Sequence, residues 1–427
     1  MALRIEATCP DDSVEGMMSA ASQEIVHCEV CGNKSLRADL NLGSHPMCDD
    51  LVRIGDHRVC KTYPIEILFC ERCITAHQRF QLPKRKLFPP SYHYRSANTN
   101  DVMMGMRNLV DATEQLVGNL LGKKVVDIGC NDGSLLAIFA ERGASTFGIE
   151  PTGAAKDARQ RGHRVIEDFF GENLARSFVE EFGRPDVISF TNVFAHIEDL
   201  AHLIQSLKVL SGSDTTIVVE NHYFGAILDK NQFDTFYHEH PRTYSYTSFA
   251  FIADALGMRI AKVEFPQRYG GNIRVFMTGR TGAAHDRWNE LWILEQQFGA
   301  RLRQLAANIE RWKARKSIQL RATFERHGKL AAKAFPGRAA IPIKMLGLDE
   351  RMISAVYEKP GSSKIGHYIP GTRIPIVSDN EFLPGSGPLL NLAWHVADEI
   401  RTYMQERGYV GGMLDIISRE DFAESQS

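Results

Sequence analysis

The chain has 427 residues, of which 24% are charged and 44% hydrophobic, and its 50 basic and 52 acidic residues leave a formal net charge of −2. This length predicts two or three domains, and the balanced charge argues against an extended nucleic-acid surface. No stretch reaches the ~18 apolar residues of a membrane span, and the polar N-terminus lacks the apolar core of a signal peptide. We therefore expect a cytoplasmic protein with a disordered leader over residues 1–23 and neither nucleic-acid nor membrane partners.

Two Cys-x-x-Cys pairs, Cys28/Cys31 and Cys70/Cys73, mark a module over residues 24–100. Each pair can present two thiolates to one zinc ion, and in a reducing compartment this pattern favours metal over a disulfide. We predict a structural zinc site, because four thiolates leave no open coordination position. Free buried thiols or a redox pair are the alternatives. Substitute ligands in the same region are Cys48, Cys60, His27, His45 and His77. Residues 24–82 otherwise have little periodicity and are expected to be loop-like, with a connector over 83–100.

Residues 101–282 alternate between strand and helix patterns after a first helix at about 101–121. Buried strands are expected at 125–128, 146–149, 187–189 and 217–220, and helices at 133–142, 153–161, 171–182 and 199–210. This alternation predicts a doubly wound parallel sheet with helices on both faces.

The segment 125–134 predicts a strand, a glycine turn and the start of a helix. Asp127 ends the strand, and Gly129 and Gly133 let the backbone approach a ligand closely. A dinucleotide-binding loop would carry a glycine where Asn131 stands. The loop instead resembles motif I of class I methyltransferases, D-x-G-x-x-x-G, which implies S-adenosylmethionine as cofactor. A generic strand–helix turn is the alternative.

Acidic and aromatic residues after the later strands extend this predicted cofactor site. Glu150 ends the second strand, where an acid accepts hydrogen bonds from ribose hydroxyls. Asp168 and Phe169 lie between the strands predicted at 146–149 and 187–189, where the class I fold usually meets adenine, and Asn192 and Phe194 follow the strand at 187–189.

A long polar helix over about 283–327 leads through a linking segment, 283–334, to a third region, 335–427. This region predicts strands at 355–357, 374–377 and 389–393 and a helix at 395–407. We expect it to be a C-terminal Rossmann-like α/β domain that binds substrate.

Four chemically active side chains adjoin one another directly after the core strands: Tyr237, His238, Glu239 and His240. Histidine has an unperturbed pKa of about 6.5 and is suited to proton transfer near neutral pH. This cluster is therefore our candidate catalytic site.

Over residues 25–410 the chain resembles sugar C-methyltransferases that act on nucleotide-linked 4-keto-deoxysugars in antibiotic pathways. The resemblance rests on the paired cysteines, the loop at 127–133, and the segments 191–197, 233–240, 269–274 and 366–376. It implies that His240 removes a proton beside the ketone to give an enolate, which is then methylated. Tyr237, His238 and Glu239 would orient the sugar or stabilise the oxyanion, and His196 is a second candidate.

The chain departs from this family at Arg242 and Thr243, where aromatic or small residues are usual, and at residues 334–340, where the usual glycine-rich turn is lost. Two other functions therefore stay open. One is an N- or O-methyltransferase acting on another small biosynthetic intermediate, and the other is a non-catalytic scaffold that retains the zinc and cofactor folds.

Overall fold

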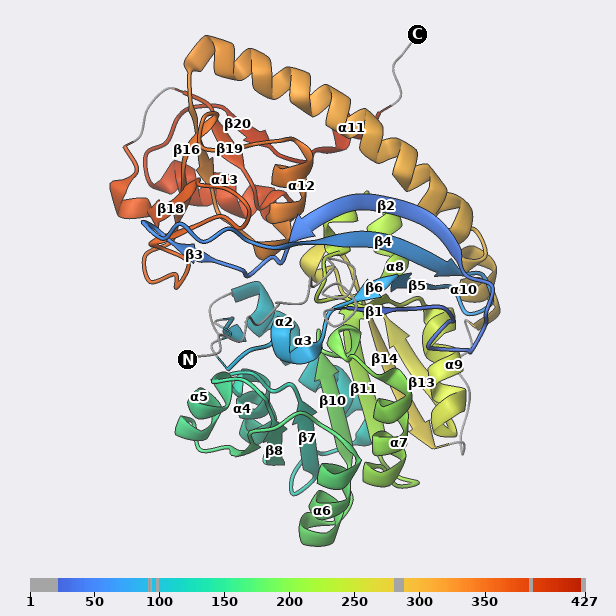
Figure 1. The fold of residues 1–427 in the computed structure, drawn as a ribbon. Coiled ribbons are helices and arrows are strands. Elements are labelled where there is room, and N and C mark those ends of the chain that lie inside the picture. Colours follow the sequence, from blue (N-terminus) through green and yellow to red (C-terminus); the bar gives the residue numbers. More distant parts are fainter. Residues whose placement is uncertain are drawn as a thin grey trace, which may run out of the picture.

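The computed structural model describes residues 22–90, 92, 94–96, 100–279, 288–383 and 387–423. The predicted leader lies outside these residues, except for Ser22 and Gln23. Figure 1 shows a central sheet at the bottom of the view, a C-terminal sheet at the upper left, and N-terminal strands lying across both. Among the described helices, none is both long enough and apolar enough to cross a lipid bilayer.

The central sheet has the strand order β13-β14-β11-β10-β7-β8-β9. The strands are β7 (Lys124–Ile128), β8 (Ser145–Ile149), β9 (Arg164–Ile166), β10 (Val187–Thr191), β11 (Thr216–His222), β13 (Met258–Glu264) and β14 (Asn272–Gly279). The five strands from β9 to β11 are parallel, and β14 is antiparallel to both β11 and β13. The predicted doubly wound sheet is confirmed. Its order reverses between β7 and β10, and such a switch opens a ligand crevice at the carboxyl ends of the strands.

Amphipathic helices bury their apolar faces on this sheet. They are α3 (Asn100–Val117), α4 (Ser134–Glu141), α5 (Ala154–Gln160), α6 (Glu172–Phe182), α7 (Leu200–Leu210), α8 (Phe224–Asp229) and α9 (Tyr246–Leu256). Their apolar side chains join those of the strands in the buried core, where Val126, Ile188 and Leu207 are fully inaccessible. The four predicted strands correspond to β7, β8, β10 and β11, and their boundaries and those of the four predicted helices lie within a few residues of these; β9 was not predicted.

The N-terminal module contains a sheet, so the expectation of a loop-like segment over residues 24–82 is wrong. Its strands are β2 (Arg37–Pro46), β4 (Thr62–Cys70) and β5 (Thr75–Gln78), in the order β12-β5-β4-β2. The register of β2 against β4 shifts twice, between Ala38 and Leu40 and between Asn41 and Gly43. Each bulge interrupts the alternation of inward and outward side chains. The sequence of β2 therefore lacks the regular alternation of apolar and polar residues that predicts a strand.

Short elements complete this module and tie it to the other sheets. β1 (Gln23–Glu24) pairs with β6 (Phe80–Gln81), and α2 (Lys84–Leu87) follows. β12 (Arg242–Thr243) comes from the central region, and β3 (Val52–Arg53) pairs with the edge of the C-terminal sheet. The N-terminal module therefore makes backbone contact with both other parts of the chain.

The C-terminal sheet has the order β20-β19-β15-β16-β18-β17-β3 and is parallel from β20 to β18. Its own strands are β15 (Leu330–Lys333), β16 (Ile353–Glu358), β17 (His367–Tyr368), β18 (Pro375–Ser378), β19 (Leu389–Asn391) and β20 (Met413–Asp415), with helices α12 (Ala340–Met345) and α13 (Ala397–Glu406). The predicted Rossmann-like unit is confirmed, and its first strand begins at Leu330, inside the predicted linking segment.

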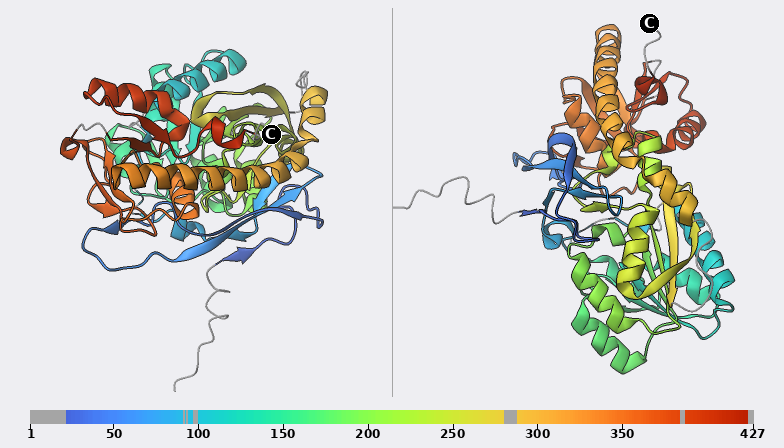
Figure 2. Two further views of the ribbon diagram at one scale, coloured as in Figure 1. Left: turned by 90° about the horizontal axis from the view of Figure 1, so that it is seen from above. Right: turned by 90° about the vertical axis from the view of Figure 1, so that its right-hand side faces the viewer.

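The single helix expected over residues 283–327 is two helices in the described residues, α10 (Trp288–Glu295) and α11 (Phe298–His327). The break follows Glu295, a fully buried carboxylate that accepts hydrogen bonds from the backbone N–H groups of Tyr246 and Thr247, both at 2.8 Å. Glu295 thus caps α9, and the chain turns before α11 begins. Figure 2 shows α11 spanning the molecule from the central part to the C-terminal part.

Candidate functional site

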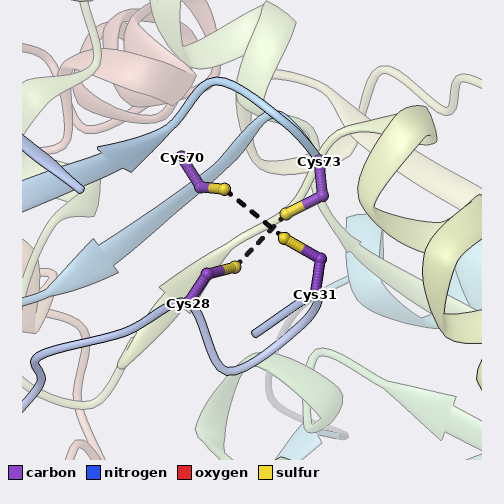
Figure 3. A group of neighbouring side chains, drawn as sticks. All are labelled: Cys28, Cys31, Cys70 and Cys73. Carbon is purple, nitrogen blue, oxygen red and sulfur yellow. Dashed lines mark hydrogen bonds between the residues drawn. The ribbon is translucent and has the colours of Figure 1, made fainter. Parts of the chain in front are cut away.

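The four predicted zinc ligands meet at one point between two loops. The sulfur atoms of Cys28, Cys31, Cys70 and Cys73 all lie within 4.8 Å of one another, and Figure 3 shows them directed toward a common centre. Sulfurs bound tetrahedrally to one zinc ion at about 2.3 Å lie about 3.8 Å apart. Cys28 and Cys73 are 3.3 Å apart and Cys31 and Cys70 are 3.6 Å apart, so this set of thiolates fits a closed, structural zinc site.

A buried polar chain connects this cluster to the central region. His77 Nε2 lies 3.3 Å from the sulfur of Cys28, and His77 Nδ1 lies 3.5 Å from Glu29. The other carboxylate oxygen of Glu29 is 2.6 Å from Nη1 of Arg242, whose side chain is fully buried. Arg242 therefore stabilises the N-terminal zinc module. It is not among the residues that line the cavity described below, so the unusual residue at this position does not alter the wall of that cavity.

Arg242→Met should lower the free energy of unfolding by about 3–5 kcal/mol, because the buried carboxylate of Glu29 would lose its partner. Urea denaturation of the zinc-loaded protein measures this change. The double variant Glu29→Gln/Arg242→Met should recover part of the loss, since neither charge then remains buried alone. A double-mutant cycle with no coupling between the two positions would contradict the pairing.

A cavity of about 970 Å³ lies where the carboxyl ends of the central and C-terminal parallel strands face each other. The central sheet contributes the segments after β7, β8, β9, β10 and β11, and the C-terminal sheet contributes those after β15, β16 and β19. The N-terminal module closes it with Cys48, Asp49 and Tyr92. We refer to this space as the main cavity. All three parts of the chain are needed to form it.

Five predicted cofactor-binding residues line the main cavity: Gly129, Asn131, Glu150, Phe169 and Asn192. Gly129 has a φ of 74°, and a Cβ there would overlap the side chain of Val193. Glu150 accepts hydrogen bonds from the backbone N–H of Asn131 at 3.0 Å and of Thr152 at 2.9 Å. These bonds hold the carboxylate at the end of β8, beside the glycine turn.

Four other predicted cofactor residues are not among the side chains that line the main cavity. Asp127 is buried beneath the loop, where it accepts a hydrogen bond from Ser189 Oγ at 2.7 Å, and burial raises its pKa to about 7. Gly133 is the N-terminal cap of α4, with a φ of 77°. The exposed carboxylate of Asp168 accepts a bond from its neighbour's N–H, and Phe194 packs against Phe190 in the core.

The predicted catalytic residues His240, Tyr237, Glu239 and His196 line the main cavity together. The ring of His240 lies 4.1 Å from that of Tyr237 and 4.9 Å from that of His196, measured between centroids. The fifth, His238, is directed away, because its Nε2 contacts the carbonyl of Tyr63 at 3.1 Å.

Hydrogen bonds to backbone carbonyl groups determine the tautomers of His240 and His196. His240 Nδ1 lies 2.9 Å from the carbonyl oxygen of Thr235, and His196 Nδ1 lies 2.6 Å from that of Glu239. A carbonyl can only accept, so each Nδ1 carries the hydrogen and each Nε2 keeps its lone pair. Burial is the largest cause of a lowered pKa for both rings, and neighbouring histidines lower the pKa of His240 further. The lowered pKa values favour the neutral form of both imidazoles, and His240 Nε2 is the basic nitrogen that its tautomer leaves available.

Burial disfavours the ionised forms of three acidic side chains that line the main cavity, Tyr92, Tyr237 and Glu239. Burial raises the pKa of Tyr92 and Tyr237 well above the ordinary value of 10. Burial and, after it, the nearby Asp49 raise the pKa of Glu239 well above 4.5. Protonated phenol and carboxyl groups can donate hydrogen bonds to an oxygen that gains negative charge.

Sequence reasoning missed several residues that line the main cavity: Tyr92, His222, Arg268, Arg338 and His395. His222 ends β11, and its ring lies 5.3 Å from that of His240. A polar residue at the end of a predicted buried strand was the available signal for it. His395 and Arg338 come from the C-terminal sheet, and nothing in the local sequence relates them to His240.

Three family models match consecutive parts of the chain. A model of zinc-binding domains matches residues 28–88, a methyltransferase domain matches 104–263, and a C-methyltransferase C-terminal domain matches 267–416. These matches cover the cysteine cluster, the central sheet and the C-terminal sheet respectively.

Individual relatives agree with these models. The chain is 28% identical to C-methyltransferase NovU of Streptomyces niveus over 387 residues, which cover 88% of this chain and 91% of that protein. It is 34% identical over 116 residues to a ubiquinone biosynthesis O-methyltransferase of Actinobacillus pleuropneumoniae, covering 25% of this chain and 48% of that protein. Among solved structures, magnesium protoporphyrin IX methyltransferase from Synechocystis with bound S-adenosylmethionine matches 42% of this chain and 82% of its own, at 19% identity and a TM-score of 0.32.

Proposed function

We propose that this chain, an S-adenosylmethionine-dependent methyltransferase that matches a C-methyltransferase C-terminal domain, methylates the carbon beside the ketone of a nucleotide-linked keto-deoxysugar. The observation that carries this proposal is the setting of His240, a neutral imidazole with a free basic nitrogen in a cavity shared by the two parallel sheets. A carbon acid needs such a base, whereas an amine acceptor already has a lone pair.

In this proposal His240 Nε2 takes the proton from the carbon beside the ketone, and the electrons of the broken C–H bond form an enolate. Positioned bases of this kind contribute about 10²–10⁴-fold in rate. The phenol of Tyr237 and the protonated form of Glu239 would donate hydrogen bonds to the enolate oxygen. Tyr92, whose hydroxyl donates to Oε2 of Glu239 at 3.4 Å, would orient that carboxyl group. When bound, S-adenosylmethionine would supply an electrophilic methyl group to the enolate carbon, and the electron pair of the broken S–CH₃ bond would stay on its sulfur.

The cofactor occupies the crevice between β7 and β10 in this proposal, as the glycine turn and the acid after β8 both favour. Glu150 would accept hydrogen bonds from the ribose hydroxyls, and Phe169 would pack against the adenine. Gly129 brings the backbone close to the methionine part. Asp127 supports the loop from below through Ser189.

The C-terminal sheet repeats this arrangement, which supports a nucleotide-linked acceptor. Glu358 is the last residue of β16 and Glu150 directly follows β8, so each acid lies at the carboxyl end of its strand. Glu358 accepts a hydrogen bond from the backbone N–H of Phe335 at 2.6 Å. An acid at this position of a Rossmann-like sheet suits a ribose. Lys359, Ser362 and Ser363 line the main cavity beside it and offer donors for a diphosphate.

The test uses nucleotide-diphosphate 4-keto-deoxysugars with isotopically labelled S-adenosylmethionine. We expect label on carbon, and we expect the purified enzyme to exchange the proton beside the ketone with deuterated water before any methyl transfer. Mass spectrometry measures both. Methyl transfer to nitrogen or oxygen without exchange of the C–H proton would overturn the carbon mechanism, and no transfer to any nucleotide sugar would overturn the substrate class.

Glu150→Ala should weaken binding of S-adenosylmethionine and S-adenosylhomocysteine by about 1–3 kcal/mol, because ribose hydroxyls in a buried site would lose their acceptor. Calorimetric titration measures the affinities. Asp127→Ala should also weaken binding, indirectly, through the loop that it supports. Unchanged affinity in the Glu150 variant would contradict its role.

A further inference from the structure

Arg268 is a buried cation at one wall of the main cavity. It begins the short helical turn η4 (Arg268–Gly270) between β13 and β14, is only 7% exposed, and lines the cavity. The carbon chemistry proposed above gives it no role.

The surrounding residues restrict the position of this guanidinium group. Its Nη1 lies 3.1 Å from Oε1 of Glu220, a fully buried residue of β11 that also accepts hydrogen bonds from Asn272 at 3.0 Å and Arg274 at 2.7 Å. On the opposite side, α3 has a glycine where the guanidinium lies. A Cβ on Gly105 would overlap the Cδ, Nε and Nη1 atoms of Arg268. The side chain is thus held in one orientation.

Its hydrogen-bond network places Arg268 beside the end of β10. The backbone N–H of Asn192 donates to the carbonyl of Glu220 at 2.7 Å, and the side chains of Asn272 and Asn192 are 3.5 Å apart. Asn192 lines the crevice on the β10 side of the topological switch, opposite the β8 side that carries Glu150. With the ribose at Glu150, the amino-acid end of the cofactor extends toward β10.

Among the described residues, the other cationic side chains that line the main cavity lie away from the end of β10. Lys84 stands 4.7 Å over the ring of Phe169, and Arg95 pairs with Asp157 of α5 at 2.5 Å, both on the adenosine side. The remaining lysines and arginine of the cavity wall come from the C-terminal sheet.

We propose that Arg268 binds the α-carboxylate of S-adenosylmethionine. A guanidinium matches a carboxylate in charge and in planar geometry, and Glu220 and Gly105 hold this one in place before the cofactor arrives. Anchoring the carboxylate on one side and the ribose on the other fixes the sulfonium between them. This inference rests on the cofactor placement proposed above and does not depend on the identity of the methyl acceptor.

The test compares S-adenosylmethionine with decarboxylated S-adenosylmethionine, which lacks only the carboxylate, by calorimetric titration. Wild-type protein should bind the intact cofactor more tightly. Arg268→Gln should weaken binding of the intact cofactor by about 10- to 100-fold, as expected for a lost charge-assisted hydrogen bond, and change binding of the decarboxylated form by less than about threefold.

Arg274→Gln is the matched control, because Arg274 shares Glu220 but is not among the residues that line the cavity. It should affect both ligands equally. Equal weakening of both ligands by Arg268→Gln would mean that Arg268 only supports the fold and would overturn the proposal. If Arg268→Gln does not fold, wild-type protein that binds the two ligands equally well would overturn it, and Arg268→Lys should show a smaller selective loss.

Discussion

Replacing His240 with asparagine should lower the rate of methyl transfer by about 10²–10⁴-fold, the usual contribution of a positioned base. Binding of S-adenosylmethionine should change little, because His240 lies among the catalytic side chains and not beside Glu150. The asparagine amide can still donate to the carbonyl of Thr235, which now accepts from His240 Nδ1 at 2.9 Å. The variant therefore removes the basic nitrogen while preserving the local fold. Single-turnover kinetics and calorimetry separate the two effects.

His45→Asn is a matched control for this substitution. His45 is also a buried histidine with one ring nitrogen on a carbonyl, that of Leu42 at 2.7 Å, but it lies in β2 and is not among the residues that line the main cavity. It should retain near-normal turnover. His240→Asn should additionally lose exchange of the substrate's C–H proton with deuterated water. Near-normal turnover of His240→Asn would remove it as the base, and His196 or His222 would be examined next.

The pH dependence of kcat/KM offers an independent check on His240. Burial, and then the neighbouring His196 and His222, lower the pKa of His240 well below 6.5. A base fails only when it is protonated, so activity should persist as the pH falls through 6.5 and decline below it. An acidic limb at or above pH 6.5 would contradict a buried histidine base.

Much of this architecture follows from local sequence patterns. The strands that became β7, β8, β10 and β11 are short buried runs between glycine turns and amphipathic helices, so local periodicity was sufficient to predict them. The clustering of Tyr237, Glu239 and His240 was predicted for the same reason, since these residues are neighbours in the chain. The orientation of His238 was not predicted, because adjacent residues in an irregular loop can point in opposite directions.

Features that depend on distant parts of the chain escaped prediction. β2 is bulged twice, so the alternation that marks a strand is lost, and β3 and β12 are two-residue strands that exist only through their partners. From the sequence alone, Arg242 was interpreted as a departure from the family that affects the substrate. Its buried pairing with Glu29 depends on β12 joining the N-terminal sheet, and no local pattern encodes this contact.

Removal of zinc should produce the largest loss of stability in this protein. Binding of a structural zinc ion to four thiolates is worth about 10–16 kcal/mol in small zinc modules at pH 7, which is as large as the whole stability of a typical domain. Purified protein should contain about one zinc ion per chain. Cys70→Ser, or a strong chelator, should unfold the module, because Cys70 ends β4 and Cys73 precedes β5.

The destabilisation caused by zinc removal should extend to the main cavity. β5 pairs with β12, whose first residue, Arg242, follows His240 by two positions, and β3 forms the edge of the C-terminal sheet. Zinc removal should therefore lower the melting temperature and expose the segment around His240 to proteolysis, and zinc added back soon after chelation should restore both. Cys60→Ser is the matched control, because this buried cysteine of the same module contacts the carbonyl of Asp50 and lies outside the cluster. It should keep its zinc. Zinc-free protein with unchanged melting temperature and activity would refute the structural role of the metal.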